Sequence, residues 1–196
     1  MAPGDPQSEA TETGSNVLLR GTWLDGVNDD RCADLLAVDR TDEVKVLLIT
    51  ITMAPRTRVR TVDSALDTDP EEVAVITTDP DAGSTPGDSA PSVPGATTVT
   101  TTRNPGDLTG LGVSIMDRFS DWESDDAAVS VCLHSITPLL QYNTLDEVFH
   151  FLRIVTDEVA SAGAVAHYHL DPTAHDEQTR QRLLPLFDRT EDVTTE

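Results

Sequence analysis

Lysine is almost absent from this chain: Lys45 is the only lysine among 13 basic residues, which face 35 acidic ones and give a formal net charge of −22. A carboxylate-rich surface nearly without lysine stays hydrated at molar salt, where screening shortens the repulsion between charges. We therefore expect a protein adapted to a halophilic cytoplasm. The charge also disfavours nucleic-acid binding, since no basic stripe is present to displace counterions from phosphates.

Cysteines and long apolar runs are scarce as well. Cys32 and Cys132 are the two cysteines, each among apolar residues, and are interpreted as free, buried thiols. The longest apolar runs, such as 46–49, fall far short of the roughly 18 residues that a membrane span needs. The first residues carry neither the cationic start nor the apolar segment of a signal peptide. These absences predict a cytoplasmic protein without membrane insertion.

The composition along the chain predicts one domain with polar ends. Residues 1–15 hold no large apolar side chain beyond Met1 and are expected to form a disordered tail. Residues 79–96 are rich in Pro, Gly, Ser and Asp, and apolar segments resume on both sides of them, which predicts a flexible inserted loop. A single domain over 16–193, followed by a short tail at 194–196, fits this length.

Short apolar runs rich in β-branched residues alternate with helical patterns. Several of the runs are apolar on both faces, as expected of strands covered by helices above and below. This alternation predicts a three-layer α/β sandwich with a mostly parallel central sheet. The predicted strands are Asn16–Gly21, Val44–Thr52, Val73–Thr78, Thr97–Thr102, Ala127–His134 and Ala164–Leu170.

Three helices are predicted from apolar stripes at helical spacing, over Asp107–Phe119, Leu145–Ala160 and His175–Phe187. Thr144, with Glu147 three residues on, has the pattern of a capping box and marks the start of the second helix. Pro185 is expected to cut or kink the third.

Ligands of α/β sheets bind beyond the carboxyl ends of the strands, so the turn after the first strand is informative. A phosphate-binding loop needs glycines, a lysine and a following hydroxyl. Here Gly21, Thr22 and Gly26 follow the strand, but no lysine does, because Lys45 opens the second strand instead. The residues that follow would repel a triphosphate: Asp25, Asp29 and Asp30.

Four apolar stretches carry a family resemblance: 16–19 followed by Gly21, then 46–50, 108–113, and 129–140 leading into 148–152. From Ser15 to about Val193 this layout resembles the RecA/KaiC-type ATPase domain, in particular the small KaiC-like proteins of haloarchaea with degenerate nucleotide motifs. In active relatives the strand corresponding to 129–133 ends in an acidic Walker B residue, usually followed by serine. This chain has His134 before Ser135. A neutral imidazole cannot replace the carboxylate that holds the magnesium shell.

The resemblance implies a RecA/KaiC-like pseudo-ATPase with no cofactor, whose degenerate nucleotide site comprises Gly21, Thr22, Gly26, His134 and Ser135. Such domains commonly assemble side by side, so the resemblance also implies a regulatory or signalling module that binds itself, an active paralogue or another protein. Two alternatives stay open. One is a switch that retains weak ATP or GTP binding, and the other is a DNA-associated regulator.

Arg56, Arg58 and Arg60 form the only basic cluster of the sequence. On an extended segment, alternating arginines would line one side and could contact an anion or an acidic partner. The alternative is charge balance through ion pairs with a neighbouring acidic loop.

Histidines near the end of the last predicted strand raise a metal hypothesis, because His167 and His169 would point to one face, with Asp171 and His175 just downstream. The alternative, a strand whose polar face holds histidines, is favoured, and no metal site is predicted. Cys132 lies two residues before His134 on the same face but without a further pair. Ser135 and His134 are adjacent, so on a strand they point to opposite faces and do not form a hydrolase pair.

Overall fold

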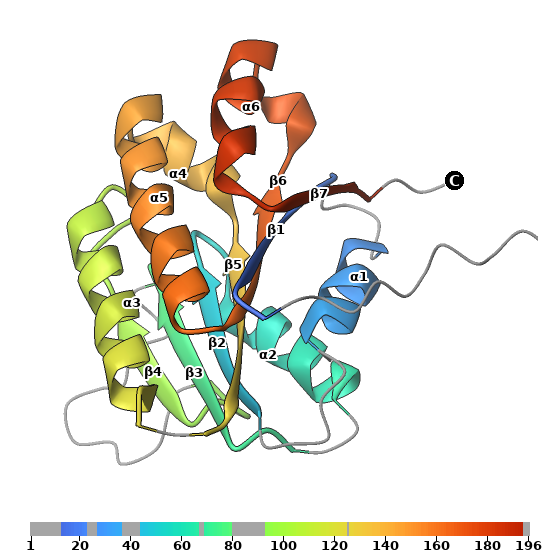
Figure 1. Cartoon of the computed structure of the whole chain (residues 1–196), viewed down its shortest axis with the longest axis vertical. Coiled ribbons are helices and arrows are strands. Elements are labelled where there is room, and N and C mark those ends of the chain that lie inside the picture. Colours follow the sequence, from blue (N-terminus) through green and yellow to red (C-terminus); the bar gives the residue numbers. More distant parts are fainter. Residues whose placement is uncertain are drawn as a thin grey trace, which may run out of the picture.

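The computed structural model describes residues 13–22, 27–36, 44–66, 69–79, 93–124 and 126–193, and these form a seven-stranded parallel sheet between two layers of helices (Figure 1). The strand order is β4-β3-β2-β5-β6-β1-β7. This confirms the predicted three-layer α/β class. The strands are β1 Ser15–Arg20, β2 Val44–Thr50, β3 Glu72–Thr77, β4 Thr98–Thr101, β5 Ala128–His134, β6 Val165–Leu170 and β7 Arg189–Asp192.

The helices divide between the two faces of the sheet, with α1 and α2 on one and α3 and α5 on the other (Figure 1). Right-handed crossovers explain the division. The crossovers through α1 and α2 run toward the β4 edge of the sheet, whereas those through α3, α4 with α5, and α6 run toward the β7 edge. The helices are α1 Val27–Leu36, α2 Pro55–Ala65, α3 Leu108–Trp122, α4 Ile136–Tyr142, α5 Leu145–Ser161 and α6 Glu177–Leu183, with 3-10 turns at Pro172–Ala174 and Leu184–Leu186.

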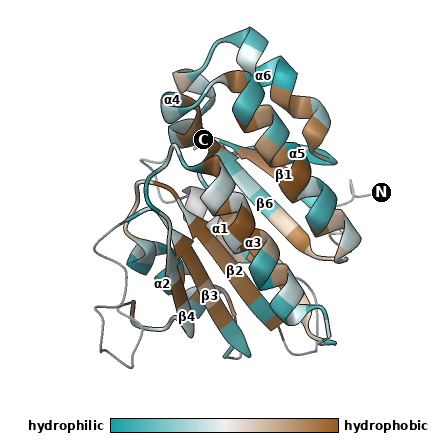
Figure 2. Cartoon of the chain, turned by 90° about the vertical axis from the view of Figure 1, so that its left-hand side faces the viewer, coloured by the Kyte–Doolittle hydropathy of each residue, from teal (hydrophilic) through white to brown (hydrophobic). Residues whose placement is uncertain are grey.

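Apolar side chains form cores on both faces of the sheet, since side chains alternate along each strand. Leu47, Ile49 and Tyr168 pack toward α3 and α5, whereas Val46 and Leu48 pack toward α1 and α2. Figure 2 shows β2 and β3 largely hydrophobic, while β6 turns hydrophilic toward its carboxyl end although it lies in the middle of the sheet. None of the helices in the described residues is long and apolar enough to cross a membrane.

The start of α5 lies where its capping box predicts, whereas α3 continues to Trp122, three residues beyond its predicted end. The Thr144 hydroxyl accepts a hydrogen bond from the Glu147 amide, and the Glu147 carboxylate accepts one from the Thr144 amide, which completes the capping box of α5. The Asp107 carboxylate caps α3 by accepting from the Gly110 amide at 2.9 Å. Pro185 lies in the 3-10 turn that follows α6, so it ends the helix as expected.

Several elements differ from the prediction. Residues 55–65 form helix α2 rather than an extended segment, and α1, α4 and β7 were not predicted. β2 ends at Thr50, and Ser15 already belongs to β1. The described part of the inserted loop includes Val93, which is buried. The remainder of that loop at 80–92, the N-terminal residues 1–12 and the tail at 194–196 lie outside the described residues.

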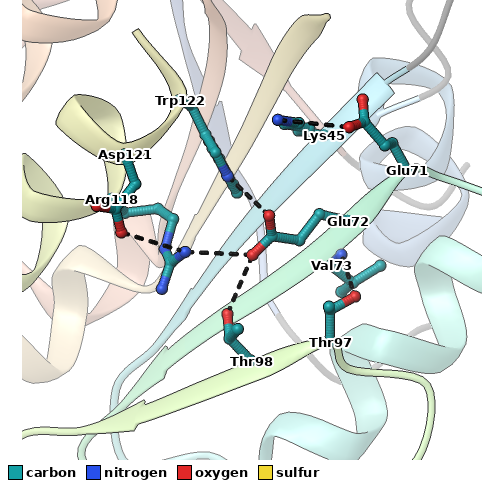
Figure 3. Close-up of polar contacts among 9 residues, drawn as sticks. All are labelled: Lys45, Glu71, Glu72, Val73, Thr97, Thr98, Arg118, Asp121 and Trp122. Atoms are coloured by element: carbon teal, nitrogen blue, oxygen red, sulfur yellow. Dashed lines mark hydrogen bonds and ion pairs between the residues drawn. The ribbon is translucent and has the colours of Figure 1, made fainter. Parts of the chain in front are cut away.

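A polar network joins β3, β4 and α3 at the amino edge of the sheet (Figure 3). The Glu72 carboxylate accepts hydrogen bonds from Trp122 Nε1 at 2.9 Å, Arg118 Nη1 at 3.2 Å and Thr98 Oγ1 at 3.4 Å. The side chains of Glu72 and Arg118 are 19% and 17% exposed, so solvent screens this pair less than a surface pair. The network fixes the end of α3 against the start of β3.

Candidate functional site

The carboxyl edge of the sheet gathers the residues predicted to form a degenerate nucleotide site. Gly21 follows β1 and donates its amide to Leu170 O of β6 at 3.1 Å, while Ser135 follows β5. Both strands pair with β6, which separates them. Thr22 lies beside Gly21 and is partly exposed, whereas Gly26 lies outside the described residues.

His134 is buried at the end of β5, with its ring centroid 4.7 Å from that of His169. Burial lowers the pKa of His134 to about 2, with help from the charges of His169 and Arg58, so its imidazole is neutral. Ser135 is also buried, and its hydroxyl accepts a hydrogen bond from the Thr137 amide at 3.2 Å as the N-cap of α4. Ser135 therefore caps helix α4, whereas His134 packs against His169.

The three clustered arginines do not line one side of a segment, which corrects the prediction for Arg56, Arg58 and Arg60. They lie on α2, which begins with Pro55, a residue favoured at the first helical position. Residues four apart on a helix share a face, and those two apart lie on nearly opposite faces. Accordingly Arg56 and Arg60 are exposed, whereas Arg58 is 4% exposed and its charge lowers the pKa values of His134 and His169. Of the three, Arg58 is the one that influences the ionisation of the buried histidines at the carboxyl edge.

The only lysine lies at the opposite edge of the sheet. Lys45 Nζ is 3.6 Å from a carboxylate oxygen of Glu71 and 5.8 Å from the ring centre of Trp122, and the side chain is 4% exposed (Figure 3). At about 3.3 Å per residue, five residues of β2 separate Lys45 from the carboxyl edge by roughly 16 Å. Its ammonium group is therefore far from any phosphate bound beyond Thr50.

Four buried sulfur- and nitrogen-bearing side chains converge on the α1 face of the sheet. Cys32 comes from α1, Cys132 from β5, and His167 and His169 from β6, and one candidate ligand atom of each lies within 4.8 Å of the others. The Sγ atoms of the cysteines are 3.7 Å apart. Cys32 Sγ is 3.0 Å from His167 Nε2, and Cys132 Sγ is 3.5 Å from His169 Nε2. We call these four residues the Cys–His cluster.

The ionisation of the Cys–His cluster departs from that of free side chains. A hydrogen bond from Cys132, supported by the neighbouring imidazoles of His167 and His169, holds the pKa of the Cys32 thiol well below its ordinary value, against the opposing effect of burial. Burial lowers the pKa of His169 to about 4. A thiolate beside a neutral imidazole is the state in which both side chains can bind a metal.

The Cys–His cluster differs from the histidine group considered in the sequence. His167 and His169 do share one face, but they point to the cysteines rather than to Asp171 and His175. Asp171 instead caps a 3-10 turn by accepting from the Thr173 amide, and His175 Nε2 lies 3.3 Å from Thr137 Oγ1. Both cysteines are free and buried, as predicted. No local pattern in the sequence could predict that the two cysteines lie together, because 100 residues separate Cys32 from Cys132.

A groove of about 660 Å³ lies on the opposite layer, between α3 and α5. Val113 of α3 and Ile154 of α5 line it and are 54% and 58% exposed. Its other lining residues include the apolar Leu108, Met116 and Phe151 and the acidic Asp107, Asp117 and Glu147.

Comparison with known proteins places the sequence in a family without an assigned activity. The model of a family described as "Family of unknown function (DUF7504)" matches residues 14–192. The sequence matches none of the curated proteins.

Solved structures share the fold at low sequence identity. A Pyrococcus horikoshii OT3 protein, PH0250, superposes with a TM-score of 0.58 at 13% identity, over 95% of this chain and 85% of that chain. The uncharacterized protein PH0321 from Pyrococcus horikoshii, solved in complex with an unknown peptide, gives a TM-score of 0.61 at 14% identity, over 92% of this chain and 78% of that chain. At these identities the similarity establishes the architecture and nothing about activity.

Proposed function

This chain belongs to the family of unknown function DUF7504, and we propose that it is a non-catalytic, RecA/KaiC-like α/β domain that acts in regulation by binding other proteins. The observation that carries the proposal is that the described part of the carboxyl edge of the sheet lacks the charged side chains that bind nucleotides and magnesium. Phosphate transfer in a P-loop domain needs a lysine and a magnesium-holding carboxylate at the carboxyl edge. The only lysine is instead buried at the amino edge, and β5 ends in the neutral imidazole of His134.

The groove between α3 and α5 supports the protein-binding part of the proposal. Val113 and Ile154 are large apolar side chains that remain more than half exposed, and such exposure is typical of interaction surfaces when it borders a hollow. Carboxylates of Asp107, Asp117 and Glu147 also line the groove. By charge complementarity, we infer that the partner presents an apolar surface bordered by basic side chains.

Calorimetric titration with magnesium-ATP in molar KCl tests the nucleotide part. We expect no saturable heat, because the only lysine lies at the amino edge of the sheet and acidic residues follow Gly21. Titration of a P-loop ATPase from a halophile in the same buffer is the positive control. Stoichiometric binding of magnesium-ATP would contradict the proposal and favour the nucleotide-dependent switch.

Co-purification from a halophilic host at native salt tests the groove, with three baits: the wild type, Ile154→Gln and Arg153→Gln. Arg153 is exposed next to Ile154 but does not line the groove, so Arg153→Gln is the matched control. We expect one protein to be retained by the wild type and the control and reduced at least tenfold with Ile154→Gln. That protein is then mixed in purified form with each bait. Equal binding to all three baits would place the interaction elsewhere, and sedimentation of the wild type alone reports self-association.

A further inference from the structure

The centre of the sheet contains a polar cluster that the proposed function does not use. Cys32, Cys132, His167 and His169 are each at most 1% exposed. The cysteines pack among aliphatic side chains such as Val46 and Leu48, and the buried ring of His134 lies beside His169. Each imidazole lies at hydrogen-bond distance from a cysteine sulfur, yet burial of two imidazoles is costly even so, and valine or leucine would fill the same space at lower cost. We therefore expect an interaction that offsets the cost of burying these four side chains.

The spacing of the cluster approaches that of one tetrahedral ion. The four ligand atoms lie within 4.8 Å of one another, so the longest separation has to shorten by up to about 1 Å when an ion binds. With zinc–sulfur bonds of about 2.3 Å and zinc–nitrogen bonds of about 2.0–2.1 Å, a tetrahedron has sulfur–sulfur edges of about 3.8 Å and sulfur–nitrogen edges of about 3.6 Å. The Sγ atoms of Cys32 and Cys132 are 3.7 Å apart, and Cys132 Sγ lies 3.5 Å from His169 Nε2. The third distance, 3.0 Å from Cys32 Sγ to His167 Nε2, needs an outward shift of about half an ångström to fit the same tetrahedron.

Regular secondary structure positions all four ligands. His167 and His169 are two residues apart on β6 and so share a face, and Cys132 of β5 lies directly opposite His167 in the parallel register. Cys32 extends from α1 over that face. Ligands held by neighbouring strands and a packed helix are preorganised, so binding requires little rearrangement.

The donor chemistry selects the ion. Two thiolates and two neutral imidazoles carry two negative charges, which a divalent cation neutralises, so the complete site can be buried. Magnesium and calcium require oxygen ligands, whereas a tetrahedral set of two sulfurs and two nitrogens is typical of zinc. Four protein ligands leave no position for water or substrate, which is the pattern of a structural site.

We propose that Cys32, Cys132, His167 and His169 bind one zinc ion in a closed tetrahedral site that fastens α1 to β5 and β6. His134 lies beside the site but outside the four-ligand set. The site is independent of the protein-binding function, since the groove lies on the other layer of the fold.

Metal analysis of the untagged wild-type protein, refolded with and without zinc, tests the proposal. We expect one zinc per chain, and on substitution with Co²⁺ an intense tetrahedral ligand-field band with thiolate charge transfer. Octahedral cobalt, no retained zinc, or a Cys32–Cys132 disulfide in the protein as purified would overturn the proposal.

Variants assign the ligands. Cys132→Ser and His169→Gln should weaken zinc binding by more than the roughly 10–100-fold that loss of an outer-shell partner costs. His175→Ala, which removes a partly exposed histidine outside the cluster, should keep one zinc per chain. If a cluster variant fails to fold, release of zinc from the folded wild type on modification of its two thiols gives the same information. Zinc release that does not follow thiol modification would contradict the assignment.

Discussion

Removal of zinc by a strong chelator is expected to lower the free energy of unfolding by about 4 kcal/mol, if free zinc stood at about 1,000 times its dissociation constant before chelation. For a domain of this length, about 4 kcal/mol corresponds to a decrease in the melting temperature of roughly 8–16 °C. The loss has a physical cause in the structure, because Cys32 is the ligand that ties α1 to the sheet. Thermal unfolding in molar salt, with and without chelator, measures it.

The effect should be local as well as global. Without zinc, amide hydrogen exchange should accelerate in α1 and at the carboxyl end of β6, while α5 on the opposite face keeps its protection. His175→Ala should respond to chelator as the wild type does, and a variant that already lacks zinc should not respond. An unchanged melting temperature after complete removal of one zinc per chain would show that the ion has no structural role.

Glu72→Ala is expected to cost about 2–4 kcal/mol of unfolding free energy, because it leaves an indole N–H and a guanidinium group without their acceptor. Trp122 is 5% exposed and donates to Glu72 at 2.9 Å, so its N–H cannot turn to water without movement of α3. Arg118 retains its ion pair with the more exposed carboxylate of Asp121, at 3.5 Å, and its position over the ring of Trp122. Urea unfolding monitored by tryptophan fluorescence measures the loss.

Two controls distinguish the loss of the Glu72 network from the loss of one negative charge: unfolding in molar KCl, and a variant that removes a carboxylate from the surface. The Glu72 network is largely buried, so molar KCl should not restore the lost stability, whereas it would screen a surface pair. Glu177→Ala removes the same charge from an exposed pair with Arg180 on α6 and should leave the unfolding midpoint unchanged. A loss that is equal in the two variants would mean that net charge, rather than the network, sets the stability.

Most of the sheet could be predicted from the sequence, since runs that are apolar on both faces have few other arrangements. The runs at 46–49 and 129–133 lie inside β2 and β5 as expected. The prediction of an extended segment at 56–60 was wrong, because alternation of arginine with threonine and valine resembles a strand, and Pro55, which marks the start of α2, was not recognised as a helix-start signal. Strand β7 is short and polar at the edge of the sheet, so it carries no apolar pattern.

The sequence by itself determined the layered α/β class, the capping of α5 at Thr144 and the absence of a lysine from the first turn, because each depends on residues near one another in the chain. Only the tertiary structure decided what the cysteines and histidines do together. Cys32 and Cys132 meet because the crossover through α1 returns over β5, and β6 is inserted between β5 and β1. Contacts of this kind follow from chain topology, and local residue patterns do not encode them.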